Sequence, residues 1–171
     1  MERGEALSFS LRYVLLLLFA IGNLYIIYLI ATPATIKASF FFIKELYPEA
    51  VLLGDTIFFK GYYASIVSAC VAGAAYYLLL ILNLTTPMNI KKRISSILFL
   101  LISFFIINIA RIVFFARLFD KGYNYFDLTH LAVWYIGSTL LVVILWGIAV
   151  FLFSIEGIPV YSDFISILKE T

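Results

Sequence analysis

Long apolar segments, each about as long as a membrane-spanning helix, dominate this chain of 171 residues. An α-helix rises about 1.5 Å per residue, so about 20 apolar residues cross a hydrocarbon core of roughly 30 Å. Hydrophobic residues make up 64% of the chain and charged residues 13%, against roughly 45–50% and about 25% in soluble domains. The sequence therefore predicts an all-α integral membrane protein, with about four helices in a single transmembrane domain. The expected spans are residues 11–31, 66–84, 94–119 and 130–153.

The first span has to be distinguished from a cleaved signal peptide. Residues 11–31 exceed the apolar region of a signal peptide, which is usually about 7–15 residues long. Pro33 also stands where a small-residue cleavage site would be expected. We therefore expect the first span to be retained as a membrane helix.

A change of composition marks the segment between the first two spans. Prolines, glycines and mixed charges interrupt the apolar pattern over residues 32–65, which we predict to be an outer loop. Within this loop, residues 36–46 have apolar side chains at near-helical spacing, as in a helix that lies in the membrane interface. The sequences on either side of Lys60 and Gly61 predict a short β-hairpin.

The distribution of charge predicts an orientation in the membrane. Residues 85–93 form a short loop with three basic residues and no acidic one. The positive-inside rule assigns such a loop to the cytoplasm. The loops at residues 32–65 and 120–129 then face outward, and both termini are cytoplasmic. We expect a multi-pass protein of the cell membrane, in contact with membrane lipids.

Composition also excludes several functions. The net charge is +2 and no polybasic tail is present, so the chain lacks the clustered cations that nucleic-acid binding requires. The single cysteine, Cys70, excludes an internal disulfide and a multi-thiolate metal site. The single histidine, His130, excludes a paired-histidine zinc motif. We therefore expect neither a metal nor an organic cofactor.

Three side chains stand out as candidates for chemistry, because polar and ionisable residues within a span are costly and usually functional. Arg111 lies about 26 Å along its span from the cytoplasmic loop, and Cys70 about 21 Å along its own. His130 opens the fourth span at its outer end. Cys70, Arg111 and His130 are thus predicted to meet at the outer boundary of the membrane.

Each of these residues has a chemical role that needs the others. A thiol attacks only as the thiolate, which a neighbouring cation or a helix N-terminus favours. Arg111 supplies a permanent cation, and it alternatively stabilises the oxyanion of a tetrahedral intermediate. His130 is the natural proton carrier near neutral pH. Asn108 and Asp127 are candidates for supporting roles, with Asp127 either capping its helix or orienting the imidazole.

Ordinary structural roles compete with this interpretation. A lone cysteine in an apolar helix is usually inert, and an arginine near a helix end usually extends to the interface. If the polar residues only join helices, the protein is a non-catalytic membrane subunit or assembly factor. If Arg111 and His130 line a path, it is a small transporter, although transporters usually place polar residues at mid-membrane depth.

At these residues the chain resembles the archaeosortase/exosortase family of membrane-embedded cysteine transpeptidases. The resemblance rests on three short features in a fixed order, each at an outer helix end. They are Ser68-Ala-Cys-Val-Ala-Gly73, Asn108-Ile-Ala-Arg-Ile112 and His130. The extended segment Gly54-Asp-Thr-Ile-Phe-Phe-Lys-Gly61 precedes them, and the similarity covers roughly residues 50–145.

The resemblance implies a function and an assignment of roles. Cys70 would be the nucleophile, Arg111 the stabilising cation and His130 the acid and base. The substrates would be secreted proteins with a C-terminal sorting signal, made of a short motif, a membrane helix and a basic tail. Cleavage near the motif would leave a thioester on Cys70. Transfer to an amine acceptor would follow, in archaea a lipid headgroup, with hydrolysis by water as the alternative.

Overall fold

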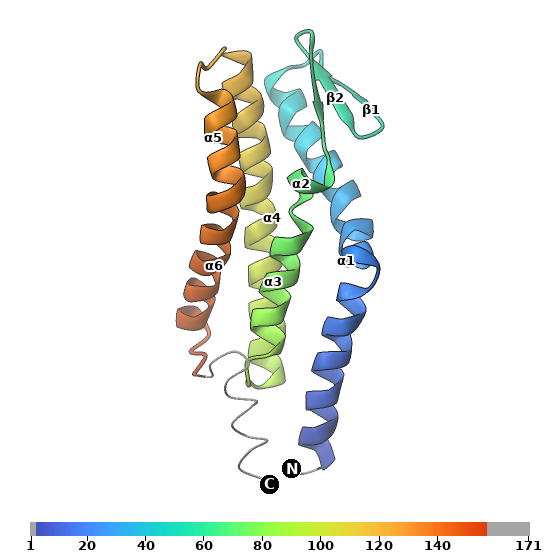
Figure 1. The fold of residues 1–171 in the computed structure, drawn as a ribbon, viewed down its shortest axis with the longest axis vertical. Helices are drawn as coiled ribbons and strands as arrows, with labels where there is room; N and C mark the ends of the chain where they lie inside the picture. The colour runs from blue at the N-terminus through green and yellow to red at the C-terminus, as the bar shows by residue number, and fades with distance from the viewer. Residues whose placement is uncertain (1–2, 157–171) are drawn as a thin grey trace.

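The computed structural model describes residues 3–156, with the backbone alone at residues 3–9, 22 and 23. The predicted cytoplasmic termini fall in residues 1–2 and 157–171, outside the described residues. Helices run along the axis of an elongated bundle, and a small sheet lies at one end (Figure 1). The elements are α1 (Arg3–Leu46), β1 (Val51–Leu53), β2 (Thr56–Phe59), β3 (Tyr62–Ser65), α2 (Ser68–Val71), α3 (Gly73–Leu84), α4 (Ile90–Asp120), α5 (Phe126–Ala132), the π-helix η1 (Val133–Gly137) and α6 (Ser138–Leu152).

Helix α1 is longer than the predicted first span and corrects the predicted loop. Residues 32–46 are helical and continue α1 through Pro33, whereas we expected them to begin an outer loop. The expectation of a helix over residues 36–46 is confirmed, but as the end of α1. Unwinding in an apolar surrounding would leave several backbone groups without partners, which costs more than the one hydrogen bond that proline removes.

A three-stranded antiparallel sheet follows α1 and modifies the all-α expectation. The predicted hairpin is confirmed: β2 pairs with β3 around Lys60 and Gly61. Both turn residues have positive φ, 47° and 80°, as a two-residue type I′ turn requires. Strand β1, which we did not predict, pairs with β2 across a second two-residue turn that begins at Gly54.

The predicted second span, residues 66–84, is divided into two helices. Ala72 adopts a left-handed conformation, with φ 58° and ψ 43°, and separates α2 from α3. Gly73 follows this break and packs directly against α1. A Cβ atom at position 73 would lie 2.6 Å from Cζ of Tyr28, so the absence of a side chain permits the close approach of α3 to α1.

The loops on either side of α4 are shorter than predicted. Helix α4 begins four residues earlier than the expected third span, and Asn89 caps it by accepting a hydrogen bond from the backbone N–H of Lys92 at 2.8 Å. Arg93, which we assigned to the cytoplasmic loop, is only 8% exposed and donates to the carbonyls of Asn83 and Thr86. It stabilises the chain at the end of α3, where helix carbonyls lack partners.

The fourth predicted span differs in its beginning and in its regularity. It starts at Phe126 rather than at residue 130, so the predicted outer loop over residues 120–129 contracts to residues 121–125. Between α5 and α6 the backbone forms the π-helix η1. Such an insertion changes which side chains face the bundle, and π-turns of this kind are frequent at functional sites.

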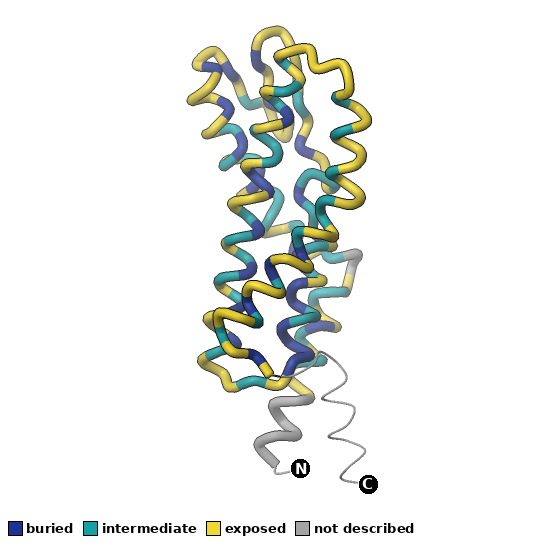
Figure 2. The backbone as a smooth tube through the Cα atoms, turned by 90° about the vertical axis from the view of Figure 1, so that its left-hand side faces the viewer, coloured by how far each residue is buried: buried dark blue, intermediate teal, exposed yellow. Residues whose placement is uncertain are grey.

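The structure supports an integral membrane protein. Three helical segments are long and apolar enough to cross a membrane, and two shorter apolar helices accompany them. The three are Leu24–Leu46, Ile90–Asp120 and Phe126–Leu152, and the shorter ones are Ser10–Ile21 and Ser68–Leu84. The count of four spans remains a prediction. Figure 2 shows exposed residues along most of the bundle. On α4 an apolar stripe at four-residue spacing is 53–60% exposed, formed by Ile94, Leu98, Ile102 and Ile106, as a lipid-facing helix requires.

Candidate active site

A cavity of about 420 Å³ lies near the sheet end of the bundle, and it brings the three candidate residues together. Cys70 reaches it from α2, Arg111 from α4 and His130 from α5. These elements are far apart in the sequence, and the fold brings the three side chains to one cavity. Its other lining residues are mostly apolar or aromatic, among them Phe59, Phe115, Phe119, Phe126 and Trp134.

The position of Cys70 follows from the sheet. Only two residues separate β3 from α2, so the hairpin fixes the entry of the chain into the cavity. The Cys70 Sγ lies 4.0 Å from the carbonyl oxygen of Ser65, and the Cys70 N–H donates to the carbonyl of Val67 at 2.8 Å. Because α2 has only four residues, its dipole contributes little, and the cation beside Cys70 has to come from another element.

Arg111 supplies that cation. It is partly buried on α4 and lines the same cavity as Cys70. Its Nη1 donates to Oγ of Ser138 at 2.8 Å. Within residues 3–156, no carboxylate lies within ion-pair distance of its guanidinium. The charge is therefore available to a thiolate or to a developing oxyanion.

Ser138 is a site residue that the sequence did not identify. It is the first residue of α6 and follows η1 directly. In the apolar sequence of residues 130–153 a serine gives no sign of its direction, because the π-helix changes the register of everything that follows it. The hydroxyl holds one end of the Arg111 guanidinium and thereby fixes the direction of its remaining donors.

His130 lies on α5 with its ring held by two phenylalanines. The ring is parallel to that of Phe126, with centroids 5.7 Å apart, and perpendicular to that of Phe115, with centroids 4.9 Å apart. In the part of the chain that the structure describes, neither ring nitrogen makes a hydrogen bond. The imidazole is thus oriented by packing alone, and its nitrogens are available for proton exchange.

Of the two candidates for supporting roles, Asn108 contacts Cys70 and Asp127 does not. Asn108 is 2% exposed, and its Nδ2 donates to the carbonyl oxygen of Cys70 at 2.9 Å. The break at Ala72 deprives this carbonyl of a regular helical partner, and Asn108 replaces it. Asp127 is exposed near the start of α5, where Tyr125 occupies the cap position, and among the described residues it makes no hydrogen bond or ion pair. Neither a capping nor an orienting contact is present for Asp127.

We expect Asn108→Leu to destabilise the protein and to disturb Cys70. The variant keeps the size of the side chain but leaves the partly buried carbonyl of Cys70 without a donor, which costs about 1–3 kcal/mol. Unfolding in detergent micelles, monitored by circular dichroism, measures this loss. Ile107→Leu, at a 40% exposed neighbouring position, is the matched control. Equal stabilities for the two variants would contradict this role of Asn108.

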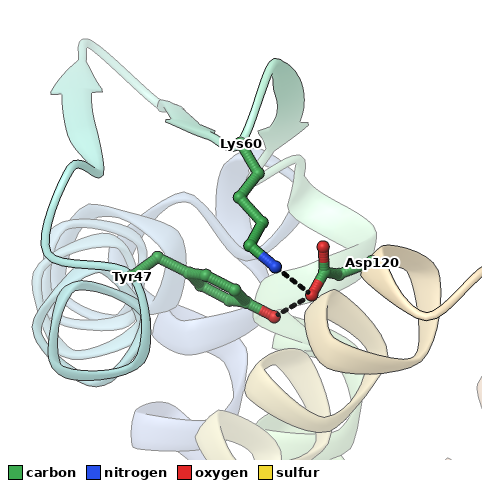
Figure 3. Close-up of polar contacts among 3 residues, drawn as sticks. All are labelled: Tyr47, Lys60 and Asp120. Atoms are coloured by element: carbon green, nitrogen blue, oxygen red, sulfur yellow. Dashed lines mark hydrogen bonds and ion pairs between the residues drawn. The ribbon is translucent and has the colours of Figure 1, made fainter.

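A polar cluster joins three elements beside the cavity (Figure 3). Asp120, the last residue of α4, accepts hydrogen bonds from the Tyr47 hydroxyl at 2.9 Å and from Lys60 Nζ at 3.1 Å. Lys60 Nζ also lies 5.3 Å from the centre of the Tyr47 ring, which stacks on Phe59. The tip of the hairpin is thereby held to the ends of α1 and α4. The sequence did not predict this cluster.

The hydrogen bond to Asp120 raises the pKa of Lys60 above its ordinary value. A raised pKa means that the contact contributes fully below the unfolded-state value, about 10.4, and is lost as the pH rises through the folded-state value. We expect Asp120→Asn to lower the pKa of Lys60 towards that ordinary value. An NMR titration of ¹³C-methylated lysines in micelles measures this, with the signal of Lys91, at the other end of the bundle, as the control. An unchanged Lys60 titration would refute the contact.

Within residues 3–156, no group of three or more histidine, cysteine, aspartate or glutamate side chains is placed to hold a metal ion. The polar side chains among the lining residues are a thiol, a guanidinium and an imidazole, together with the hydroxyls of Ser65 and Tyr63 and the indole of Trp134.

Comparison with known proteins gives no assignment: no protein-family model, no curated protein and no solved structure matches this chain. The described residues form a mostly helical protein that has three helices long and apolar enough to cross a membrane and a pocket that contains a thiol.

Proposed function

We propose that this protein is a membrane-embedded cysteine peptidase or transpeptidase of the archaeosortase/exosortase type. The observation that carries the proposal is the shared cavity of Cys70, Arg111 and His130, contributed by three separate helices. A nucleophile, a cation and a proton carrier are the parts that thiol-based acyl transfer requires.

In the proposed reaction, the thiolate sulfur of Cys70 attacks the carbonyl carbon of a peptide bond. The carbonyl electron pair moves to the oxygen, and Arg111 stabilises the resulting oxyanion. When the carbonyl re-forms, the carbon–nitrogen bond breaks, and the amine leaves with a proton from His130. The product is a thioester on Cys70. An acceptor amine then attacks this thioester, gives its proton to His130 and restores the thiolate; water in place of the amine gives hydrolysis.

The proposed substrates are secreted proteins with a C-terminal signal that contains a motif, a membrane helix and a basic tail. The proposed acceptor is the amine of a lipid headgroup. In this proposal the protein crosses the cell membrane several times, both termini are cytoplasmic and the active site is at the outer face.

The proposal can be tested without a substrate. In purified protein at pH 7, we expect chloroacetamide to alkylate Cys70 about tenfold or more faster in the wild type than in Arg111→Gln, because the cation favours the reactive thiolate. His130→Gln should also slow the reaction, and intact-protein mass spectrometry measures each rate. Arg117→Gln is the matched control, since Arg117 is exposed on the same helix and does not line the cavity.

Equal alkylation rates in all four proteins would contradict the proposal. Cys70 would then be an ordinary thiol, and the polar residues of the cavity would serve only to join helices. A non-catalytic membrane subunit would be the better description in that case.

A further inference from the structure

Strand β3 is an edge strand, and one side of it has no partner strand among the described residues. The sheet has the order β1-β2-β3, so β3 pairs with β2 on one side only. An edge strand presents a row of unpaired backbone N–H and C=O groups, which is a template for a further strand. The sequence of this edge is Tyr62-Tyr-Ala-Ser65.

The register decides which of these groups face away from β2. In a hairpin with a two-residue turn, the residues that flank the turn exchange both hydrogen bonds, and the pattern then alternates along the strands. Tyr62 and Ala64 therefore pair with β2, opposite Phe59 and Ile57. The hydrogen bond from the N–H of Ile66 to the carbonyl of Asp55, 2.9 Å, continues this alternation. The backbone groups of Tyr63 and Ser65 thus face the free edge. The Ser65 carbonyl already accepts from the N–H of Val67 at 3.2 Å, so the N–H and carbonyl of Tyr63 are the groups that an added strand would pair with first.

The free edge leads to Cys70. Tyr63, Ala64 and Ser65 all line the cavity that contains Cys70, Arg111 and His130. The carbonyl of Ser65, one of the groups that face the free edge, lies 4.0 Å from Cys70 Sγ. A chain segment that extended along this edge would consequently have its backbone close to the Cys70 thiol.

We propose that β3 binds an extended peptide by strand addition and that this pairing presents the peptide carbonyl to Cys70. The occupant is an extended, apolar segment of a protein substrate. Main-chain hydrogen bonds give the affinity in this mode of recognition, and side-chain pockets give the selectivity. Aromatic side chains of Phe59, Phe119 and Phe126 line the cavity, and no acidic residue between positions 3 and 156 does. Unpaired backbone groups beside such apolar surfaces gain more from a partner than they would in open water.

Strand addition deepens the proposed function, since it rests on that function for the fate of the peptide. The binding step itself needs only the edge of β3. The two are therefore separable by experiment, provided that peptide binding and thiol reactivity are measured with different reagents.

The probe is an acetylated tetrapeptide of alternating alanine and leucine that ends in a chloromethyl ketone. Its chloride is displaced by the Cys70 thiolate, so intact-protein mass spectrometry gives the alkylation rate. Chloroacetamide, which has no peptide to bind, gives the reactivity of the thiol alone. The ratio of the two rates measures peptide recognition separately from the activation of Cys70.

The decisive pair of variants is Tyr63→Pro and Tyr63→Ala. Both remove the phenol, but only proline removes the N–H that faces the free edge and places a ring there. We expect Tyr63→Pro to lower the rate ratio about tenfold, the effect of losing one or two ordinary hydrogen bonds, and Tyr63→Ala to lower it far less. Leu52→Pro is the matched control, because the N–H of Leu52 faces the opposite free edge of the sheet, on β1. It should leave the ratio unchanged.

A second measurement tests strand addition on the wild type, so that it does not depend on correct folding of Tyr63→Pro. Two versions of the probe, N-methylated at alternate amides in the two possible registers, are compared on the wild type. In an added strand only one set of amides faces β3, so the two rates should differ about tenfold. Equal ratios for Tyr63→Pro and Tyr63→Ala in folded protein, or equal rates for the two methylated probes, would overturn strand addition.

The outcomes also separate the two proposals. If the ratio depends on Tyr63 while the chloroacetamide rate is indifferent to Arg111, strand addition stands and the peptidase function fails. If Arg111 controls the chloroacetamide rate while the ratio is indifferent to Tyr63, the function stands and the peptide binds in another way.

Discussion

Cells whose only copy of this protein carries Cys70→Ala should accumulate secreted proteins with their C-terminal tails intact. The thiol is the only nucleophile proposed to form the acyl intermediate, so its removal should reduce processing to below detection. The host is the organism of origin with the chromosomal copy deleted. Mass spectrometry of the C-terminal peptides of its membrane and secreted proteins measures the cut and uncut forms.

The control for this experiment is Ala69→Ser, which alters a neighbouring residue of the same cavity and leaves the thiol in place. It should process its substrates, and both variants should reach the membrane in wild-type amounts on an immunoblot. Normal C-termini in the Cys70→Ala strain would exclude a catalytic role for this residue.

The second large effect is expected at Arg111. Removing one donor that stabilises an oxyanion typically lowers turnover by about 10²–10³-fold. We expect Arg111→Gln to lower the processing rate in this range, because glutamine keeps a donor but loses the charge. Arg111→Lys should be intermediate, since lysine keeps the charge but lacks the planar fork that reaches Ser138. Pulse-chase labelling of a tailed substrate in the same host gives the rates.

Ser138→Ala separates the effect of the orientation of Arg111 from the effect of its charge. It removes the hydrogen-bond partner of Arg111 and leaves the cation, so its effect should be smaller than that of Arg111→Gln. Arg117→Gln, on the same helix but outside the cavity, should process at the wild-type rate. A similar loss in Arg117→Gln and Arg111→Gln would mean that only the overall charge of this helix matters.

The sequence predicted most of the helices and the hairpin, because their signals are local. Apolar segments long enough to cross a bilayer are recognisable at any position, and Lys60-Gly61 suits a two-residue turn. The errors have physical causes. Pro33 and the charges after it are typical of a loop, yet α1 continues through them. The left-handed residue between α2 and α3 is Ala72, a residue type with no preference for that conformation.

The site was predictable where one property, depth in the membrane, could be counted along each span. This is how Cys70, Arg111 and His130 were selected, and the structure brings them to one cavity. Contacts that depend on the rotation of a helix about its own axis could not be predicted from the sequence. The direction of the Ser138 side chain depends on the π-helix before it, and no local sequence pattern predicts that π-helix. The contact between Tyr47 and Asp120 joins residues that are 73 positions apart.

The strength of the ion pair at the hairpin tip depends on the salt concentration around the protein. The Lys60 side chain is 50% exposed and that of Asp120 16%, so dissolved ions reach their attraction, and at 1 M salt it is screened within about 3 Å. Arg111 and Cys70 lie deeper and are screened much less. Ionic strength therefore acts unequally on the two parts of the site. Concentrated salt loosens the hold on the strand beside Cys70 while it leaves the electrostatics of the thiol nearly unchanged.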